Sequence, residues 1–138
     1  MAYTARKMNY CYVTVNNRAG SCANILGQIK AAGINLQAFS GFPTGGGKAQ
    51  IDLVAERLGG IQKLARQNGW KLGSAKKGFL VQGSDEVGAI EKHVRKLAKA
   101  NINVTAADAV AAGKGRYGMI LWVKRKDYNR AAKALGAR

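Results

Sequence analysis

Residues 23–36 read ANILGQIKAAGINL, and residues 89–104 read AIEKHVRKLAKANINV. The two stretches align at an offset of 68 positions, which places Ile34-Asn35-Leu36 on Ile102-Asn103-Val104. The same offset continues without a gap over most of the chain. It also pairs glycines with glycines: Gly20 with Gly88, Gly45 with Gly113, and Gly47 with Gly115. A match of this length predicts two copies of one structural unit, which we place at residues 1–69 and 70–138.

Both copies show the same succession of hydrophobic periods. Residues 10–15 (YCYVTV) are β-branched and aromatic, which predicts a strand, and an amphipathic helix follows. The predicted remainder of copy one is a strand at 34–41, a glycine-rich turn, a strand at 48–55 and a helix at 58–68. The counterparts in copy two are strands at 102–110 and 116–124 and a helix at 126–135.

The fourth strands of the two units must come from different parts of the chain. Residues 70–76 supply it for copy one, but Arg138 is already the equivalent of Trp70, so copy two has no such strand of its own. Residues 2–8 precede copy one as 70–76 precede copy two. We therefore expect the N-terminal strand to complete the sheet of copy two. The resulting βαββαβ order is an α+β, ferredoxin-like unit with an antiparallel sheet.

Alternation along the strands predicts which side chains face the helices. Cys11, Val13 and Val15 should do so in copy one, while Ile120 and Trp122 should point to the opposite face in copy two. That opposite face is too apolar to stay wet, so we expect a further sheet to cover it. The predicted buried helix faces are Cys22, Ile25, Leu26 and Ile29 in copy one, and Ile90, His93, Val94 and Leu97 in copy two. Asn17 and Asp85 are expected to cap the helix N-termini, and Gly33 and Asn101 the C-termini.

The composition argues against catalysis and metal binding. Of 138 residues, 47% are hydrophobic, with two cysteines and a single histidine. We expect free thiols, a structural His93, no metal site and no cofactor. The carboxylates suggest no acid–base pair, so no catalytic residue and no enzyme is predicted. GFPTGGGKA is not a P-loop, because Phe42 and Ala49 stand where glycine and Ser/Thr are needed. With no membrane span and no secretory signal, we expect a cytoplasmic protein.

The net charge of +16 attracts nucleic acid, anionic membranes or acidic partners. The segment KGRYGMILWV (114–123) shares a basic residue, an aromatic and glycines with the RNP1 pattern of RNA-binding domains. Its glycine and aromatic positions do not align with that pattern. A basic RNA-binding module on a ferredoxin-like fold is therefore the alternative function.

The loops NNRAGS (16–21) and SDEVGA (84–89) each open a helix. Free N–H groups and the dipole at a helix N-terminus favour an anion such as a carboxylate. Gly20 and Gly88 permit close backbone approach, and Asn35 and Asn103 add donor and acceptor groups. Capping and turn formation alone would also account for these residues.

With these motifs the sequence resembles the tandem ACT-domain proteins. Their loop D-R-P-G is similar to Asn17-Arg18-Ala19-Gly20 here, and their G-I-N-I to Gly33-Ile34-Asn35-Leu36. Copy two matches less closely, with Asp85-Glu86-Val87-Gly88 and Asn101-Ile102-Asn103-Val104. The loop proline is replaced by Ala19 and Val87.

The resemblance implies a non-enzymatic regulatory protein that binds an amino acid or related metabolite at a domain interface. It also implies side-by-side pairing of units, hence a homodimer, and regulation of a separate protein partner. The ligand-binding residues that it implies are Asn17, Arg18, Ala19, Gly20, Ser21, Cys22, Asn35 and Leu36 in copy one, and Asp85, Glu86, Val87, Gly88, Ala89, Asn103 and Val104 in copy two.

Overall fold

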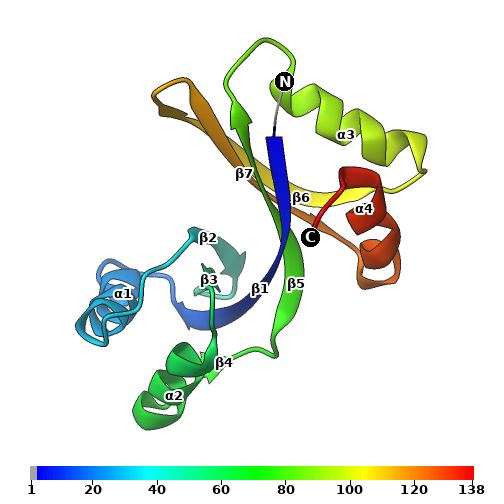
Figure 1. The fold of residues 1–138 in the computed structure, drawn as a ribbon. Coiled ribbons are helices and arrows are strands. Elements are labelled where there is room, and N and C mark those ends of the chain that lie inside the picture. The colour runs from blue at the N-terminus through cyan, green and yellow to red at the C-terminus, as the bar shows by residue number, and fades with distance from the viewer. Residues whose placement is uncertain (1–2) are drawn as a thin grey trace. The chain divides into compact units, whose positions relative to one another are not determined.

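Strand β1 (Tyr3–Asn16) belongs to two separate folding units in the computed structural model, which describes residues 3–138. The part of β1 up to Met8 joins Lys77–Arg138 in one compact unit, which we call the repeat-two unit. The part from Asn9 onward lies within Asn9–Lys76, the repeat-one unit (Figure 1). The prediction that the N-terminal strand completes the sheet of copy two is therefore confirmed.

In the repeat-one unit the strand order is β2-β3-β1-β4. Strands β3 and β4 lie antiparallel on the two sides of β1, with Cys11 opposite Leu53 and Val13 opposite Leu72. The elements after β1 are α1 (Ser21–Ala31), β2 (Ala38–Gly45), β3 (Lys48–Val54), α2 (Gly59–Asn68) and β4 (Lys71–Leu72). Residues 71–72 thus return to β1, so the compact units divide the chain differently from the sequence repeats at residue 70.

In the repeat-two unit the order is β6-β7-β5-β1. Figure 1 shows the first part of β1 beside β5, running in the opposite direction. The elements are β5 (Lys76–Ser84), α3 (Ala89–Lys99), β6 (Val104–Gly113), β7 (Arg116–Val123), a 3₁₀ turn η1 (Arg125–Asp127) and α4 (Tyr128–Leu135). The antiparallel βαββαβ architecture expected from the sequence is present in both units.

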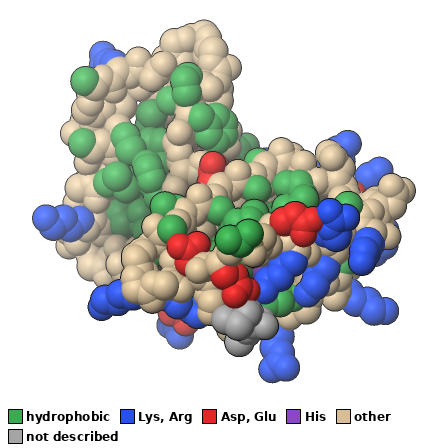
Figure 2. Space-filling model, turned by 90° about the horizontal axis from the view of Figure 1, so that it is seen from above, with side chains coloured by type: hydrophobic (Ala, Val, Ile, Leu, Met, Phe, Trp, Pro, Cys, Tyr) green, Lys and Arg blue, Asp and Glu red, His purple; other side chains and the backbone are tan. Residues whose placement is uncertain are grey.

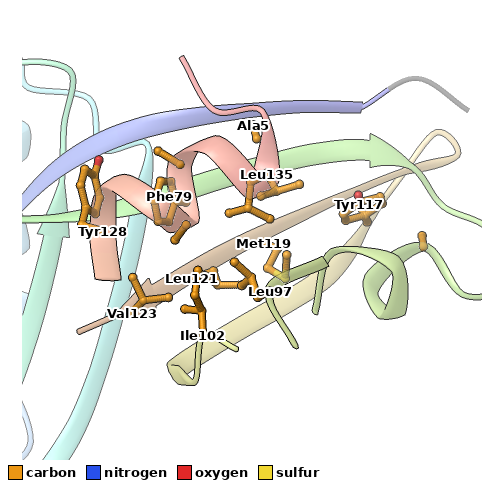
Figure 3. Close-up of a cluster of buried hydrophobic side chains, with 14 residues drawn as sticks. Ala5, Phe79, Leu97, Ile102, Tyr117, Met119, Leu121, Val123, Tyr128 and Leu135 are labelled. Atoms are coloured by element: carbon orange, nitrogen blue, oxygen red, sulfur yellow. The ribbon is translucent and has the colours of Figure 1, made fainter. Parts of the chain in front are cut away.

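Each unit has its own hydrophobic core. In the repeat-two unit Ala5 from β1 packs with Phe79 from β5, Leu121 from β7 and Leu135 from α4 (Figure 3). Phe79 also stacks on Tyr128, with 4.7 Å between ring centroids. In the repeat-one unit the helix-facing residues Cys11 and Val13 are buried as predicted. The participation of Ala5 gives the N-terminal strand a direct share in the stability of the repeat-two unit.

The predicted burial patterns hold with one exception. Met119, Leu121 and Val123 lie in the core as expected, but Val94 is 39% exposed because it lies beyond the edge of the buried face of α3. On the opposite sheet face, Ile120 and Trp122 are 8% and 7% exposed.

The N-cap residues of α1 and α3 differ from the predicted ones. The N-cap residues of helices α1 and α3 are Gly20 and Gly88, each with a backbone conformation in the left-handed region. At neither of these two helix ends does a side chain form a capping hydrogen bond. The prediction of Asn17 and Asp85 as N-caps is wrong, because a turn separates each residue from its helix. At the C-terminal ends, Gly33 and Asn101 have φ values of 73° and 57°, as predicted.

Candidate functional site

The loops that precede α1 and α3 follow the same backbone path. The N–H of Asn17 donates to the carbonyl of Gly47 at 2.8 Å, and the N–H of Asp85 donates to that of Gly115 at 2.9 Å. Gly20 and Gly88 then turn the chain with φ of 91° and 80°. A side chain would be strained at these two positions, so glycine is required by the turn itself.

In the repeat-two unit the loop borders a cavity of about 230 Å³. Four of the residues proposed from the sequence line this cavity, namely Asp85, Glu86, Gly88 and Ala89. The other lining residues are Ile90, Glu91, Ala109, Val110, Ala111 and Tyr117. The cavity thus lies between the N-terminal turn of α3 and the second half of β6.

The remaining predicted residues of copy two lie elsewhere. Val87 points fully into solvent, at 106% exposure, because it sits at the tip of the loop. Asn103 is exposed just before β6, and Val104 packs against the core where β6 begins. Neither Asn103 nor Val104 is among the described residues that line the cavity.

The cavity is rich in carboxylates. Glu86 pairs with Lys92 at 3.8 Å, and Glu91 pairs with Arg95 one helical turn further along α3. Asp85 adds a third carboxylate at the start of the loop. The first N–H groups of an α-helix have no intrahelical partner and carry partial positive charge. A ligand in this cavity would therefore meet negative side chains and positive backbone groups together.

Tyr117 connects the cavity to a polar cluster inside the repeat-two core. It lines the cavity but is only 4% exposed, and its hydroxyl forms a hydrogen bond with Nε2 of His93. The ring of His93 is fully buried and lies 4.5 Å from the ring of Tyr3, edge to face. Tyr3 in turn donates to the carbonyl of Leu135 and accepts from Nζ of Lys96.

Burial changes the proton affinity of this cluster. Burial, together with the positive charges of Lys92 and Lys96, lowers the pKa of His93 to about 4. Burial also raises the pKa of Tyr117. Both side chains are therefore neutral at physiological pH. Within the described residues, Nδ1 of His93 has no hydrogen-bond partner. The sequence predicts a structural histidine with satisfied hydrogen bonds, and the structure provides a partner for one of its two ring nitrogens.

The repeat-one loop presents a different set of side chains. Asn17, Arg18, Ala19 and Gly20 are exposed, and Ser21 and Cys22 are half-buried. Cys22 and Leu36 pack against the repeat-one core, whereas Asn35 is exposed. The offset of 68 places Ala49 at the position of Tyr117 and Ile25 at that of His93. The buried histidine–tyrosine pair is therefore specific to the repeat-two unit.

Sequence reasoning identified the loop but missed the facing wall of the cavity. Ala109, Val110 and Ala111 come from a strand whose residues are exposed, and no motif distinguishes them. A position-by-position comparison of the two copies would have indicated Tyr117, because its counterpart is Ala49.

Residues 3–138 contain no group of three or more His, Cys, Asp or Glu side chains that could hold a metal ion. No helix among these residues is long and apolar enough to cross a membrane.

The sequence matches no family model and no curated protein. The structure, in contrast, is similar to many solved structures. Protein BT0572 from Bacteroides thetaiotaomicron matches with a TM-score of 0.82 at 12% identity, covering 96% of this chain and 88% of that one. The ligand-free regulatory subunit of aspartate kinase from Thermus thermophilus matches with a TM-score of 0.62 at 12% identity, covering 98% and 93%. A putative C-terminal regulatory domain of aspartate kinase from Porphyromonas gingivalis W83 matches with a TM-score of 0.56 at 11% identity, covering 98% and 94%.

Identities this low show a common fold, and the coverage shows that the fold extends over nearly the whole chain. The protein therefore has the doubled architecture of aspartate kinase regulatory domains. The resemblance to tandem ACT-domain proteins is confirmed at the level of the fold. Two of these three structures, those from Thermus thermophilus and Porphyromonas gingivalis, are a regulatory subunit and a putative regulatory domain by name.

Proposed function

We propose that this chain is a non-enzymatic regulatory protein and that the repeat-two cavity binds an amino acid or a related small metabolite. The observation that carries the proposal is the cavity of about 230 Å³ at the N-terminus of α3. The loop before α3 and the first turn of that helix line this cavity, and the ACT resemblance implies ligand contacts from both. The resemblance also implies the start of β6 and a domain interface, whereas this cavity is lined by repeat-two residues without Asn103 and Val104. The regulatory names of the structural neighbours support the same role.

The charges around the cavity narrow the ligand. Asp85, Glu86 and Glu91 suit an ammonium group, and the N-terminus of α3 suits a carboxylate. A zwitterion satisfies both requirements. An additional negative charge on the ligand would meet the three carboxylates and be repelled. We therefore expect neutral or basic amino acids to bind, and aspartate and glutamate to be rejected.

A thermal-shift panel of the twenty amino acids tests this proposal. A ligand that binds the native state raises stability by RT ln(1 + [L]/Kd), so millimolar concentrations detect weak sites. The expected result is a shift with one or a few neutral or basic amino acids. A flat panel, or a shift with aspartate alone, would contradict the proposal.

A pair of equivalent substitutions locates the site. Glu86→Gln removes a carboxylate from the cavity, and Arg18→Gln changes the position 68 residues earlier, in the repeat-one loop. Both side chains are exposed, so both variants should fold normally. We expect Glu86→Gln to weaken ligand binding several-fold and Arg18→Gln to leave it unchanged. Equal effects of the two substitutions would argue against a site confined to repeat two.

Homodimer formation, a regulated protein partner and a cytoplasmic location belong to the same proposal. β2 and β6 end their sheets, so each leaves an edge to which another strand can pair. Analytical ultracentrifugation over a range of concentrations, with and without the ligand found in the panel, would measure the dimer. A monomer at all concentrations would remove this part of the proposal.

A further inference from the structure

The positive charge of the repeat-two unit is concentrated on its helical layer. Helix α3 carries four basic residues and one acidic residue, and the segment from η1 through α4 has the same numbers. Both acidic side chains are engaged within their own segments: Glu91 pairs with Arg95, and Asp127 pairs with Arg130 at 2.8 Å. Figure 2 shows how Lys and Arg side chains crowd the right-hand part of that view. A strong positive field is therefore left on this layer.

The basic residues of α3 lie along one flank. Lys92, Lys96 and Lys99 follow at positions i, i+4 and i+7, which places them in a stripe about 10 Å long. The ring of Tyr3 orders two of them, since the Nζ atoms of Lys92 and Lys96 lie 5.5 and 4.6 Å from its centroid. This contact holds the stripe on the side of α3 that faces α4.

Helix α4 continues the positive surface. Nη1 of Arg130 donates to the carbonyl of Ala100 at 2.9 Å, which ties the start of α4 to the end of α3. At the other end of α4, the carbonyl of Leu135 accepts from Tyr3 at 3.0 Å. The two helices therefore lie antiparallel, and Arg130 and Lys133 project on their solvent side. We call Lys92, Lys96, Lys99, Arg130 and Lys133 the basic surface.

We propose that the basic surface binds the phosphate backbone of duplex nucleic acid, independently of base sequence. Lysine acts on phosphate as a point charge and needs no fixed geometry, so a row of lysines suits a regular row of phosphates. This function is additional to ligand binding and uses residues that are not part of the cavity wall.

The surroundings of the basic surface favour a duplex over single strands. Single-strand binding relies on exposed aromatic side chains on which bases stack. Among the described residues, the exposed aromatic side chains are Phe39 and Phe42, and both lie in the repeat-one unit. Tyr117 and Trp122, which an RRM-like mode would present on the sheet, are 4% and 7% exposed. Backbone contact is thus the mode that this surface can offer.

The same surface is a poor match for a membrane. Amphipathic helices that bind membranes insert an apolar face beside their basic one. On the described part of α3 and α4, the only exposed large hydrophobic side chain is Val94. The large apolar side chains of both helices other than Val94 pack into the core or against it.

Fluorescence anisotropy with a labelled duplex of about 20 base pairs, in DNA and RNA forms, tests the proposal. Lys92 and Arg130 already pair with Glu86 and Asp127, so three residues of the basic surface remain to neutralise phosphates. With about three phosphate contacts, the affinity for duplex DNA should fall about 40-fold between about 50 and 200 mM salt, because log K changes by about −0.9 per contact. The double variant Lys99→Gln/Lys133→Gln should reduce the fall to about 3.5-fold. The matched control is Lys30→Gln/Lys63→Gln on α1 and α2, which removes the same charge from exposed positions of the repeat-one unit.

The proposal is supported if only the repeat-two pair changes the salt dependence, whichever duplex binds more tightly. It is overturned if both pairs have the same effect, since the interaction would then follow net charge alone. Tighter binding to a single strand, or binding to phosphatidylserine vesicles without binding to either duplex, would overturn it as well. Thermal melting of each variant verifies that the fold is retained.

Discussion

Acidification to about pH 5 should destabilise the repeat-two unit through a single side chain, His93. This residue is fully buried, and Tyr117 forms a hydrogen bond with its Nε2. Burial, together with the charges of Lys92 and Lys96, lowers its pKa to about 4. Folding therefore requires the neutral ring, and protonation favours the unfolded state.

The magnitude follows from the difference between the folded and unfolded pKa values. An unfolded histidine has a pKa of about 6.5, so between about pH 6.5 and 4 the unfolded chain binds a proton that the folded chain does not. The free energy of unfolding is highest above this window and falls as the pH decreases through it. The full difference of about 2.5 pKa units corresponds to about 3 kcal/mol. About 2 kcal/mol of this should be lost by about pH 5, where most carboxylates are still ionised.

Urea unfolding at several pH values between about 7.5 and 5 measures this effect. In a Trp70→Phe background the remaining tryptophan, Trp122, reports on the repeat-two unit. The comparison variants are His93→Ile, which introduces the residue of the equivalent position in copy one, and His93→Gln, which keeps a hydrogen-bonding group for Tyr117. Neither variant can titrate, so both should lose the pH dependence. If either folded variant shows the same 2 kcal/mol loss as the parent protein, the assignment to His93 is refuted.

Two further predictions concern the fold. Deleting residues 2–8 removes the buried side chains of Ala5 and Met8, so the repeat-two unit should lose its cooperative thermal transition. A truncated protein that melts like the full chain would contradict the shared role of β1. Gly73→Ala would place a Cβ in steric overlap with the ring of Tyr12 and should cost about 1–3 kcal/mol. Gly59→Ala, with nothing within 4 Å of the added Cβ, should be neutral within about 0.5 kcal/mol in urea unfolding. Equal costs at the two glycines would show that the contact with Tyr12 is not limiting.

Features that depend on local chemistry could be predicted from the sequence. The alternation of Cys11 and Val13 with polar neighbours correctly placed them in the core, because side chains on a strand alternate strictly between faces. Asn101 was correctly expected in the left-handed region, since a short polar side chain tolerates this conformation after a helix.

Features that depend on an intervening turn could not be predicted in the same way. Asn17 and Asp85 have the chemistry of N-caps, but their N–H groups bond to the far hairpin turns and the helices begin later. The competing partners, Gly47 and Gly115, lie 30 residues further along the chain. Preference for a cap position was therefore outweighed by a contact between distant segments.

The sequence by itself determined the doubled βαββαβ plan, because the repeat at an offset of 68 and the hydrophobic periods are properties of neighbouring residues. It also indicated that residues 2–8 serve copy two, since they stand before copy one as 70–76 stand before copy two. Only the tertiary structure revealed the cavity beside the repeat-two loop. That cavity requires β6 and Tyr117 to lie opposite the start of α3, and Tyr117 is held by a histidine from another element. Such a site depends on pairwise distances between segments, which local patterns of charge and hydrophobicity do not contain.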